Sequence, residues 1–256
     1  MRGEMHRVKG KIALITGGAS GIGKAAAILL AEEGAQIIVS DINVKSANET
    51  ANEIGNSAIA YEHDVTDEGS WKILLSKIKH KFGRINILVN CAGIAMIGNI
   101  EETTLEDWKN IHAVDLDSIF LGCKTALPIM VDNGPGSIIN LSSISGIIAG
   151  HNLAAYNSAK AGVRHLTKSI ALHCAKKKYD IRCNSVHPAF INTNMLDDIL
   201  PKGNREESIE RLSRQVPLGR IGEVKDVAWA IVYLASEESK FMTGAEIVLD
   251  GGLSAG

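Results

Sequence analysis

The chain has 256 residues, of which 45% are hydrophobic and 22% are charged, and its formal net charge is −2. This length suits one large α/β domain or two small ones, and the weak charge gives no electrostatic footprint for nucleic acid or an anionic membrane. The polar N-terminus and the absence of a long apolar run predict neither a signal peptide nor a transmembrane helix.

The cysteines and histidines show no pattern typical of a metal site. The 4 cysteines are scattered without Cys-x-x-Cys spacing, and the 8 histidines form no His-Glu-x-x-His motif. We interpret the cysteines as small buried residues of a protein in a reducing compartment, and so expect a cytoplasmic protein without a metal.

Short apolar runs alternate with longer helical patterns along the chain. In chain order we expect a strand at 12–16, a helix at 21–33, a strand at 36–40, a helix at 44–54, a strand at 58–62, a helix at 69–82, a strand at 85–90, a long helical stretch at 105–130, a strand at 136–141, a helix at 154–175, a strand at 181–187, a helix at 224–234 and a strand at 246–249.

This alternation predicts an α/β fold with a doubly wound parallel sheet of about seven strands and helices on both faces, a single-domain Rossmann fold. No linker or repeat divides the chain, so we expect one dinucleotide-binding domain over residues 1–256. The least regular stretch, about 190–219, is predicted to be an insertion near the substrate, because long loops in compact domains are usually functional lids or disordered.

A glycine-rich turn follows the first expected strand and opens the first expected helix. Glycine there permits a tight turn and a close approach of the backbone to a pyrophosphate, which the N–H groups of the helix N-terminus can bind. A plain turn with a helix cap would have the same composition, but the position between strand and helix favours a phosphate site. The candidate residues are Gly17, Ser20, Gly21, Ile22 and Gly23.

An acidic residue, Asp41, ends the second expected strand, eighteen residues after Gly23. A carboxylate at this place can accept hydrogen bonds from the adenosine ribose hydroxyls and would repel a 2′-phosphate. Because its neighbours Ser20 and Ile42 bring no positive charge, the sequence favours NAD over NADP.

Tyr156 and Lys160 are four residues apart on an expected helix, and Ser143 lies upstream of them. Residues spaced in this way share one helix face, where a cation favours the phenolate and is expected to lower the tyrosine pKa. The phenol then becomes a usable proton donor and acceptor near neutral pH, while a serine hydroxyl can hold a substrate oxygen beside it.

Taken together, these motifs resemble the short-chain dehydrogenase/reductase family over essentially the whole chain. Within that family, the stretch from Ile138 to Thr193 and the ending Val248-Leu249-Asp250-Gly251-Gly252 are similar to bacterial secondary-alcohol and hydroxysteroid dehydrogenases. The residues that carry the family resemblance, in family order and spacing, are Thr16-Gly17-x-x-x-Gly21-x-Gly23, Asp64-Val65, Asn90-x-Ala92-Gly93, Ser143, Tyr156-x-x-x-Lys160, Pro188 and Thr193.

The resemblance implies further roles. Asp64 and the Val65 backbone would contact adenine, and Lys160 would bind the nicotinamide ribose. Ile191 and Thr193, after Pro188, would contact the carboxamide or pyrophosphate, and the adenosine ribose would be lined by Asn90, Ala92 and Gly93. The resemblance also implies a homotetramer assembled through the long helices around 105–130 and 154–175, with a second interface at the last strand.

Three positions depart from the family pattern. Cys91 replaces a common asparagine, a change that is frequent in the family. Ala189 replaces a glycine after Pro188, which would restrict the backbone unless φ is negative there. Asp115 stands where the family has the asparagine of its catalytic tetrad, whereas Asn110 lies one helical turn too early for that position. An ionised carboxylate only accepts hydrogen bonds, so we hypothesise that Asp115 keeps the proton relay with an altered pH profile, or is protonated because it is buried.

The expected substrate side is apolar and favours an uncharged, hydrophobic alcohol or ketone. Some of the same residues could instead form a helical lid, whose inner face would still be a pocket wall. The candidates are Ile94, Ala95, Ile144, Leu153, Phe190, Met195, Leu196 and Ile199, with Leu200 and Leu212 further along.

We therefore expect an NAD-dependent secondary-alcohol or hydroxysteroid-type dehydrogenase that uses Ser143, Tyr156, Lys160 and Asp115. One alternative is a 3-oxoacyl-carrier-protein reductase, which would need NADPH and a basic patch. Another is a dinucleotide-binding member without catalysis, which would have no need to keep Ser143, Tyr156 and Lys160 together.

Overall fold

The computed structural model describes residues 6–200 and 203–255, apart from the side chains of residues 198 and 199. Its centre is a parallel sheet with the strand order β3-β2-β1-β4-β5-β6-β7. The strands are β1 Ile12–Thr16, β2 Gln36–Asp41, β3 Ala58–Glu62, β4 Ile87–Asn90, β5 Gly136–Leu141, β6 Ile181–Pro188 and β7 Glu246–Leu249.

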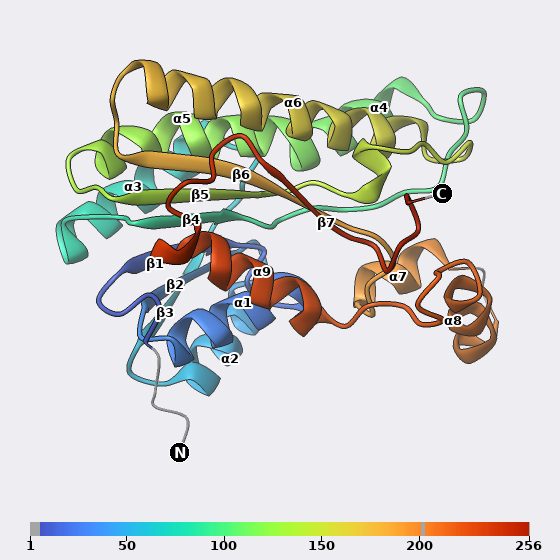
Figure 1. Cartoon of the computed structure of the whole chain (residues 1–256), viewed down its shortest axis with the longest axis horizontal. Helices are drawn as coiled ribbons and strands as arrows, with labels where there is room; N and C mark the ends of the chain where they lie inside the picture. The colour runs from blue at the N-terminus through green and yellow to red at the C-terminus, as the bar shows by residue number, and fades with distance from the viewer. Residues whose placement is uncertain (1–5, 201–202, 256) are drawn as a thin grey trace.

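Helices cover both faces of this sheet (Figure 1). Helices α1, α2 and α9 share one buried cluster with it, and α3, α5 and α6 share the other. The helices are α1 Gly21–Glu32, α2 Val44–Ile54, α3 Glu68–Phe82, α4 Leu105–His112, α5 Ser118–Val131, α6 Ala154–Lys176, α7 Asn194–Ile199, α8 Arg205–Ser213 and α9 Val224–Ala235. The predicted doubly wound Rossmann architecture is confirmed.

The middle strands form because their apolar side chains are buried on both faces of the sheet. Every residue of β1 and β4 is buried, and Leu14 of β1 lies in register with Ile38 of β2 and Leu88 of β4. Such continuous apolar runs are what a sheet covered on both faces requires. The order reverses between β1 and β4, and the carboxyl ends of strands beside such a switch point form a natural ligand crevice.

Local signals define several helix ends. The Asp67 carboxylate accepts hydrogen bonds from the first turn of α3, and Gly83 ends that helix in the left-handed conformation. The Thr104 hydroxyl accepts a hydrogen bond from Asp107 N–H and begins α4. These caps satisfy backbone groups that a helix terminus leaves unpaired, which stabilises the boundaries.

The long helix expected at 105–130 is interrupted, and this is the main departure from the sequence prediction. A π-helical turn, Ala113–Asp117, joins α4 to α5 and holds the buried Asp115. Such turns insert an extra residue into the helix and often lie at functional sites. Hydrophobic periodicity alone does not reveal one, because both flanking helices keep a regular pattern.

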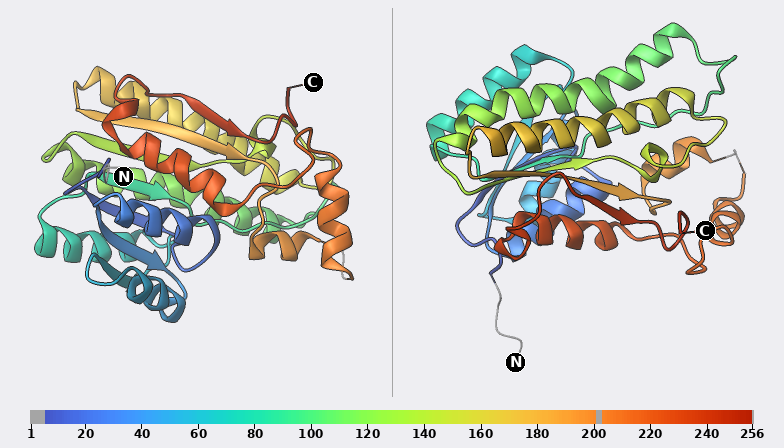
Figure 2. Two further views of the ribbon diagram at one scale, coloured as in Figure 1. Left: turned by 60° about the horizontal axis from the view of Figure 1, so that its bottom comes forward. Right: turned by 45° about the horizontal axis from the view of Figure 1, so that its top comes forward.

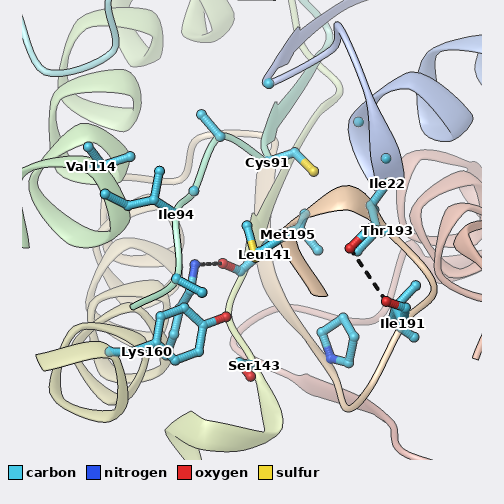
Figure 3. A pocket seen from close by; sticks show the side chains of 18 of the residues that line it. Ile22, Cys91, Ile94, Val114, Leu141, Ser143, Lys160, Ile191, Thr193 and Met195 are labelled. Atoms are coloured by element: carbon cyan, nitrogen blue, oxygen red, sulfur yellow. Dashed lines mark hydrogen bonds between the residues drawn. The ribbon is translucent and has the colours of Figure 1, made fainter. Parts of the chain in front are cut away.

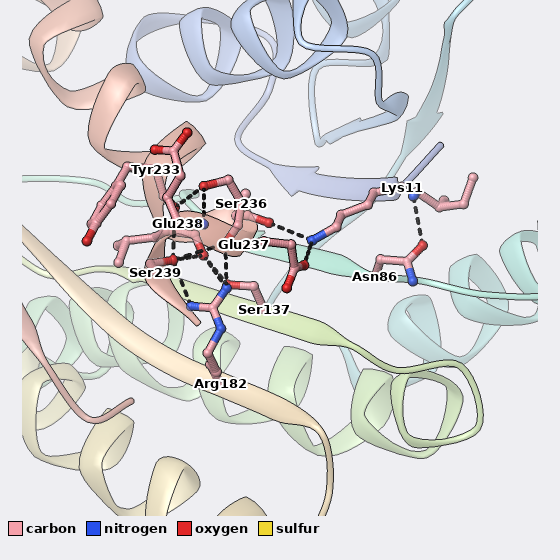
Figure 4. Close-up of polar contacts among 12 residues, drawn as sticks. Lys11, Asn86, Ser137, Arg182, Tyr233, Ser236, Glu237, Glu238 and Ser239 are labelled. Carbon is pink, nitrogen blue, oxygen red and sulfur yellow. Dashed lines mark hydrogen bonds and ion pairs between the residues drawn. The ribbon is translucent and has the colours of Figure 1, made fainter. Parts of the chain in front are cut away.

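A polar cluster ties β6 to the carboxyl end of α9 (Figure 4). The half-buried guanidinium of Arg182 donates to the carbonyls of Leu234 and Ser236 and to the Ser239 hydroxyl, at distances of 2.9 to 3.0 Å. Arginine thereby satisfies carbonyls that the end of α9 leaves without helical partners. This cluster fixes the helix against the sheet on the side away from the strands' carboxyl ends.

The expected insertion at 190–219 contains two short helices, α7 and α8, which stand off one end of the sheet in both views of Figure 2. Across the described residues, no helix is long and apolar enough to cross a membrane.

Candidate active site

A cavity of about 630 Å³ opens at the carboxyl ends of the strands. Its wall includes the loops after β1, β2, β3, β4, β5 and β6 and the starts of α1, α6 and α7. Nearly all of the predicted site residues line this one cavity, namely Gly17, Ser20, Gly21, Ile22, Gly23, Asp41, Asp64, Val65, Ala92, Gly93, Ser143, Tyr156, Lys160, Pro188, Ile191 and Thr193. The structure thus places the candidate cofactor and catalytic residues together.

The glycine-rich turn is shaped for close backbone contact. Gly17 has a φ of 65°, and a Cβ atom there would lie 2.8 Å from the backbone of Ala92. A Cβ atom on Gly23 would lie 2.2 Å from the carbonyl oxygen of Gly17. Both positions therefore require glycine. Because neither residue has a side chain, the turn can contact the loop after β4 and the first turn of α1.

The amino end of α1 faces the cavity with free backbone donors. Gly21, Ile22 and Gly23 line the cavity, and within the described chain the Ser20 side chain accepts no capping hydrogen bond from this turn. Unsatisfied N–H groups and the helix dipole together favour an anion at this point. The local arrangement fits the pyrophosphate of a dinucleotide.

Asp41 is held in place by its neighbours. Its Oδ2 accepts a hydrogen bond from Ala19 N–H at 3.1 Å, and its Oδ1 accepts one from Asn43 N–H at 3.0 Å. Among the described residues that line the cavity, Lys160 is the only lysine or arginine, and Ile42 beside Asp41 is 71% exposed. The expected ribose end of the cavity therefore presents a fixed carboxylate, with no lysine or arginine among the described lining residues beside it.

The loop after β3 forms the expected adenine end of the cavity. The Oδ1 atom of Asp64 accepts hydrogen bonds from the Thr66 N–H at 2.9 Å and from the Thr66 hydroxyl at 2.7 Å. The Val65 carbonyl accepts a hydrogen bond from the indole of the buried Trp71 at 2.9 Å. These bonds fix the backbone of the loop beside the cavity.

Ser143, Tyr156 and Lys160 meet at the other end of the cavity, as the sequence predicted. Ser143 follows β5, and Tyr156 and Lys160 lie on successive turns of α6. The Ser143 oxygen accepts a hydrogen bond from Ser145 N–H at 3.1 Å, so its own hydrogen stays available to donate. The ammonium of Lys160 donates to the Leu141 carbonyl at 3.1 Å (Figure 3).

Asp115 lies behind Lys160 and not in the cavity wall. Its Oδ1 accepts a hydrogen bond from Ile94 N–H at 2.9 Å, and its Oδ2 is 3.0 Å from the Lys160 ammonium. The Asp115 residue is 0% exposed and Lys160 is 4% exposed. The carboxylate therefore forms a buried ion pair with the lysine at the position where the family has an amide.

Burial changes the electrostatics that the sequence suggested. Burial raises the pKa of Tyr156, and although Lys160 acts to lower it, the charge of Asp115 raises it further. The net direction in the protein alone is therefore upward, which is opposite to the expected lowering. Burial acts to lower the pKa of Lys160, but Asp115 and Tyr156 outweigh this effect and raise it, so the lysine stays protonated.

Asn90 does not reach the cavity, which corrects its expected role at the adenosine ribose. Its amide donates to Asn140 Oδ1 at 2.8 Å and to Cys123 Sγ at 3.4 Å inside the buried core. The Asn90 side chain points away from the cavity because β4 is a central strand, whose residues alternate between the two faces. Asn90 is a core residue that ties β4 to β5.

The apolar end of the cavity contains most of the predicted substrate residues, Ile94, Ala95, Ile144, Leu153, Phe190, Met195 and Leu196. Leu200 and Leu212 are half-buried but do not line it. The side chain of Ile199 falls outside the described part of the structure. Asn110 and Val114 also line the cavity, although the sequence analysis did not place them there. They are four residues apart, a spacing that puts two side chains on one helix face and could have indicated that they line the cavity together.

Ala189 fits its position without strain. Among the described residues, Lys178 is the only non-glycine residue with a positive φ, so the backbone at Ala189 suits an L-residue.

The sequence analysis did not identify two supporting groups, the Leu141 carbonyl that binds Lys160 and the Thr16 hydroxyl. The Thr16 oxygen accepts hydrogen bonds from Cys91 N–H at 3.0 Å and Ala92 N–H at 3.2 Å, which joins β1 to the loop after β4.

Comparison with known proteins agrees with this geometry. Residues 17–254 match a family model described as enoyl-(acyl carrier protein) reductase. An NADP-dependent (R)-specific alcohol dehydrogenase of Lentilactobacillus kefiri is 43% identical, over 97% of this chain and 98% of the relative. A 3-beta-hydroxysteroid dehydrogenase of Comamonas testosteroni is 38% identical, over 97% of each chain.

The fold has a close match among solved structures. The crystal structure of a short-chain type dehydrogenase/reductase from Mycobacterium marinum superposes with a TM-score of 0.91 at 33% identity and covers 99% of each chain. Members of this family use a nicotinamide cofactor, and the glycine-rich turn and the free amino end of α1 suit its pyrophosphate. On its sequence, its fold and its relatives, the chain belongs to the short-chain dehydrogenase/reductase family of oxidoreductases.

Proposed function

We propose that this protein is an NAD-dependent dehydrogenase of hydrophobic secondary alcohols, acting in either direction between alcohol and ketone. The observation that carries this proposal is the meeting of Ser143, Tyr156 and Lys160 in the same cavity as Asp41 and the glycine-rich turn. One end of the cavity suits a dinucleotide, and the other end joins an acid–base group to an apolar wall.

The choice of NAD rests on Asp41. The carboxylate is held by two backbone N–H groups, so it would not turn away easily from a 2′-phosphate, and no lysine or arginine among the described cavity residues would offset its charge. The Lentilactobacillus kefiri relative is NADP-dependent by name. The cofactor proposal is therefore specific to this chain and can be tested separately from the reaction.

Each residue of the trio has a distinct role in the proposed reaction. Bound nicotinamide would supply the hydride acceptor or donor. The Ser143 hydroxyl orients the substrate oxygen, and Tyr156 takes the proton of an alcohol or gives one to a ketone. The ammonium of Lys160 lies 5.5 Å from the ring centroid of Tyr156 and so holds its charge beside the phenol. Its remaining N–H is offered to the nicotinamide ribose.

The apolar end of the cavity supports the substrate class. Its predicted residues Ile94, Leu153 and Met195 offer no charge to a phosphate or carboxylate. An uncharged hydrophobic alcohol or ketone, such as a hydroxysteroid or a cyclic alcohol, would bury its body there without leaving an ion unpaired.

Absorbance of reduced nicotinamide tests the reaction class. The purified protein is given NAD⁺ with a panel of secondary alcohols of increasing apolar size and, in parallel, NADPH with a 3-oxoacyl thioester. Oxidation of the bulkier alcohols supports the proposal. Turnover confined to the thioester would support the carrier-protein reductase reading instead.

We also propose a homotetramer. Large apolar side chains are exposed on both expected interfaces, with Phe120 on α5 and Leu172 on α6 at the first and Val248 on β7 at the second. Burying these surfaces between copies would stabilise an assembly. Light scattering at micromolar protein concentration tests this, and a monomer would contradict it.

A further inference from the structure

The ion pair of Asp115 and Lys160 changes the charge of the nicotinamide end of the cavity. With an amide at this position, protonated Lys160 would leave one net positive charge there. The carboxylate of Asp115, 3.0 Å from the ammonium, cancels that charge. Both residues are buried, so water and salt screen the cancellation weakly.

The polar contacts of Asp115 favour its ionised form. Oδ1 accepts a hydrogen bond from Ile94 N–H, and the neighbour of Oδ2 is the ammonium of Lys160. Both neighbours are donors, so a protonated carboxyl group would find no acceptor for its hydrogen among these contacts. Burial raises the pKa of Asp115, and Lys160 and the Ile94 N–H oppose that rise without cancelling it.

The pair also lies close to the cavity wall. Gly93 lines the cavity, and a Cβ atom built on it would lie 3.4 Å from Asp115 Oδ2 and 3.5 Å from Lys160 Nζ. The carboxylate and the ammonium thus both lie directly beside a residue of the cavity wall. A charged group in the cavity would therefore interact with the net charge of the pair and not with the lysine alone.

We propose that Asp115, acting through Lys160, makes the site favour oxidised over reduced nicotinamide, and so favours the alcohol-oxidising complex. The nicotinamide ring is cationic in NAD⁺ and neutral in NADH, so a positive site disfavours NAD⁺ whereas a neutral one does not. This inference rests on the proposed NAD site. Asp115 is then a positioning residue, because it acts on the bound nicotinamide only through the charge that it shares with Lys160.

The test is the dissociation constant of each cofactor form, measured by calorimetry for the wild-type protein and for Asp115→Asn. The substitution preserves shape and removes the charge. We expect Asp115→Asn to raise the ratio of the NAD⁺ dissociation constant to the NADH dissociation constant by at least about threefold. An unchanged ratio with both forms still binding overturns this inference, whereas loss of binding of both forms by the wild-type protein overturns the proposed function itself.

Asp117→Asn is the matched control, because Asp117 lies on the same π-helical turn but is exposed. Its charge is screened by solvent, so the ratio should not change. Thermal unfolding of both variants checks that they fold.

The pH dependence of the wild-type ratio gives a test that needs no variant. Lowering the pH protonates Asp115, so the ratio should rise toward that of Asp115→Asn, which should itself stay flat. The other titratable groups around the pair are Tyr156, His112 and Cys91. A pH dependence that persists in Asp115→Asn would assign the effect to one of these groups and overturn the proposal.

Discussion

The two ends of the cavity are built in different ways. At the dinucleotide end, the contacts are made by backbone and short side chains, with Gly17 and Gly23 in contact and Asp41 held by two N–H groups. At the substrate end, apolar side chains from several separate segments form the wall, including the short helix α7, and α8 follows α7 in the chain. The comparison teaches that the shape of the dinucleotide end depends on backbone geometry, whereas the shape of the apolar end depends on side chains that can change independently.

The largest effect should come from the acid–base group, where the two ends meet. Tyr156→Phe removes the proton donor and acceptor but leaves the ring, so turnover should fall by a factor on the order of 10²–10⁴. NAD⁺ affinity should stay within a few-fold, because the dinucleotide end is untouched. Steady-state kinetics and calorimetry on the same preparation check this, and normal turnover would exclude Tyr156 as the proton carrier.

Asp41→Ala should break the cofactor preference without altering the chemistry. Removing the carboxylate loses its ribose hydrogen bonds and its repulsion of a 2′-phosphate, so the NAD⁺/NADP⁺ ratio of kcat/KM should fall about 10- to 100-fold. Glu62→Ala is a control, since it removes an exposed acidic residue at the end of β3. A fall of similar size in the control would point to general electrostatics and not to contact with the ribose.

Gly23→Ala should weaken the phosphate turn through sterics alone. The added methyl group would meet the Gly17 carbonyl at 2.2 Å, so the turn must shift, at a cost of about 1–3 kcal/mol in the free energy of unfolding. Both NAD⁺ and NADH should bind more weakly, to the same degree. Chemical denaturation measures the stability, and Gly150→Ala controls for the loss of glycine itself, because φ there is not positive and an added Cβ would meet its nearest neighbours at 3.5 Å.

Asp115→Asn should move the pH profile of alcohol oxidation. Burial raises the pKa of Tyr156 and Asp115 raises it further, so removing this charge should lower that pKa. Oxidation needs the deprotonated phenol, and its rising limb should therefore move to lower pH. The pH dependence of kcat/KM checks this, and an unchanged profile and rate would count against any relay role for Asp115.

The smallest effect is expected at the contact between α7 and α8 beside the substrate end. The Arg205 guanidinium pairs with Asp197 at 2.5 Å and donates to Asn192 at 2.8 Å, and it is largely exposed. Exposed pairs of this kind contribute about 0.2–1 kcal/mol, so Arg205→Ala should raise the alcohol KM only about two- to fivefold. A large fall in NAD⁺ affinity would show that the two ends are less separate than we propose.

The sequence predicted the parts of this molecule that depend on local pattern. The buried strands follow from continuous apolar runs such as Ile37-Ile38-Val39, and the meeting of Ser143, Tyr156 and Lys160 follows from strand and helix order. The break in the expected long helix could not be predicted, because the π-helical turn at Asp115 depends on tertiary contacts with Lys160 and Ile94.

Two errors at the site have the same physical origin. The net rise of the Tyr156 pKa comes from burial, which spacing along a helix does not reveal. The inward direction of Asn90 depends on which face of β4 meets the core, with Asn140 on the neighbouring strand. Sequence pattern thus identified the reacting groups, but the desolvation and orientation of those groups required the fold.

The most direct test of the account is the ratio of kcat/KM for NAD⁺ and NADP⁺ with one hydrophobic secondary alcohol and the wild-type protein. We predict efficient turnover with NAD⁺ and a rate with NADP⁺ that is lower by about tenfold or more, because Asp41 would face the ribose and no lysine or arginine among the described cavity residues lies at that end. Equal rates, or a preference for NADP⁺, would contradict the claim that the backbone-held carboxylate determines the cofactor.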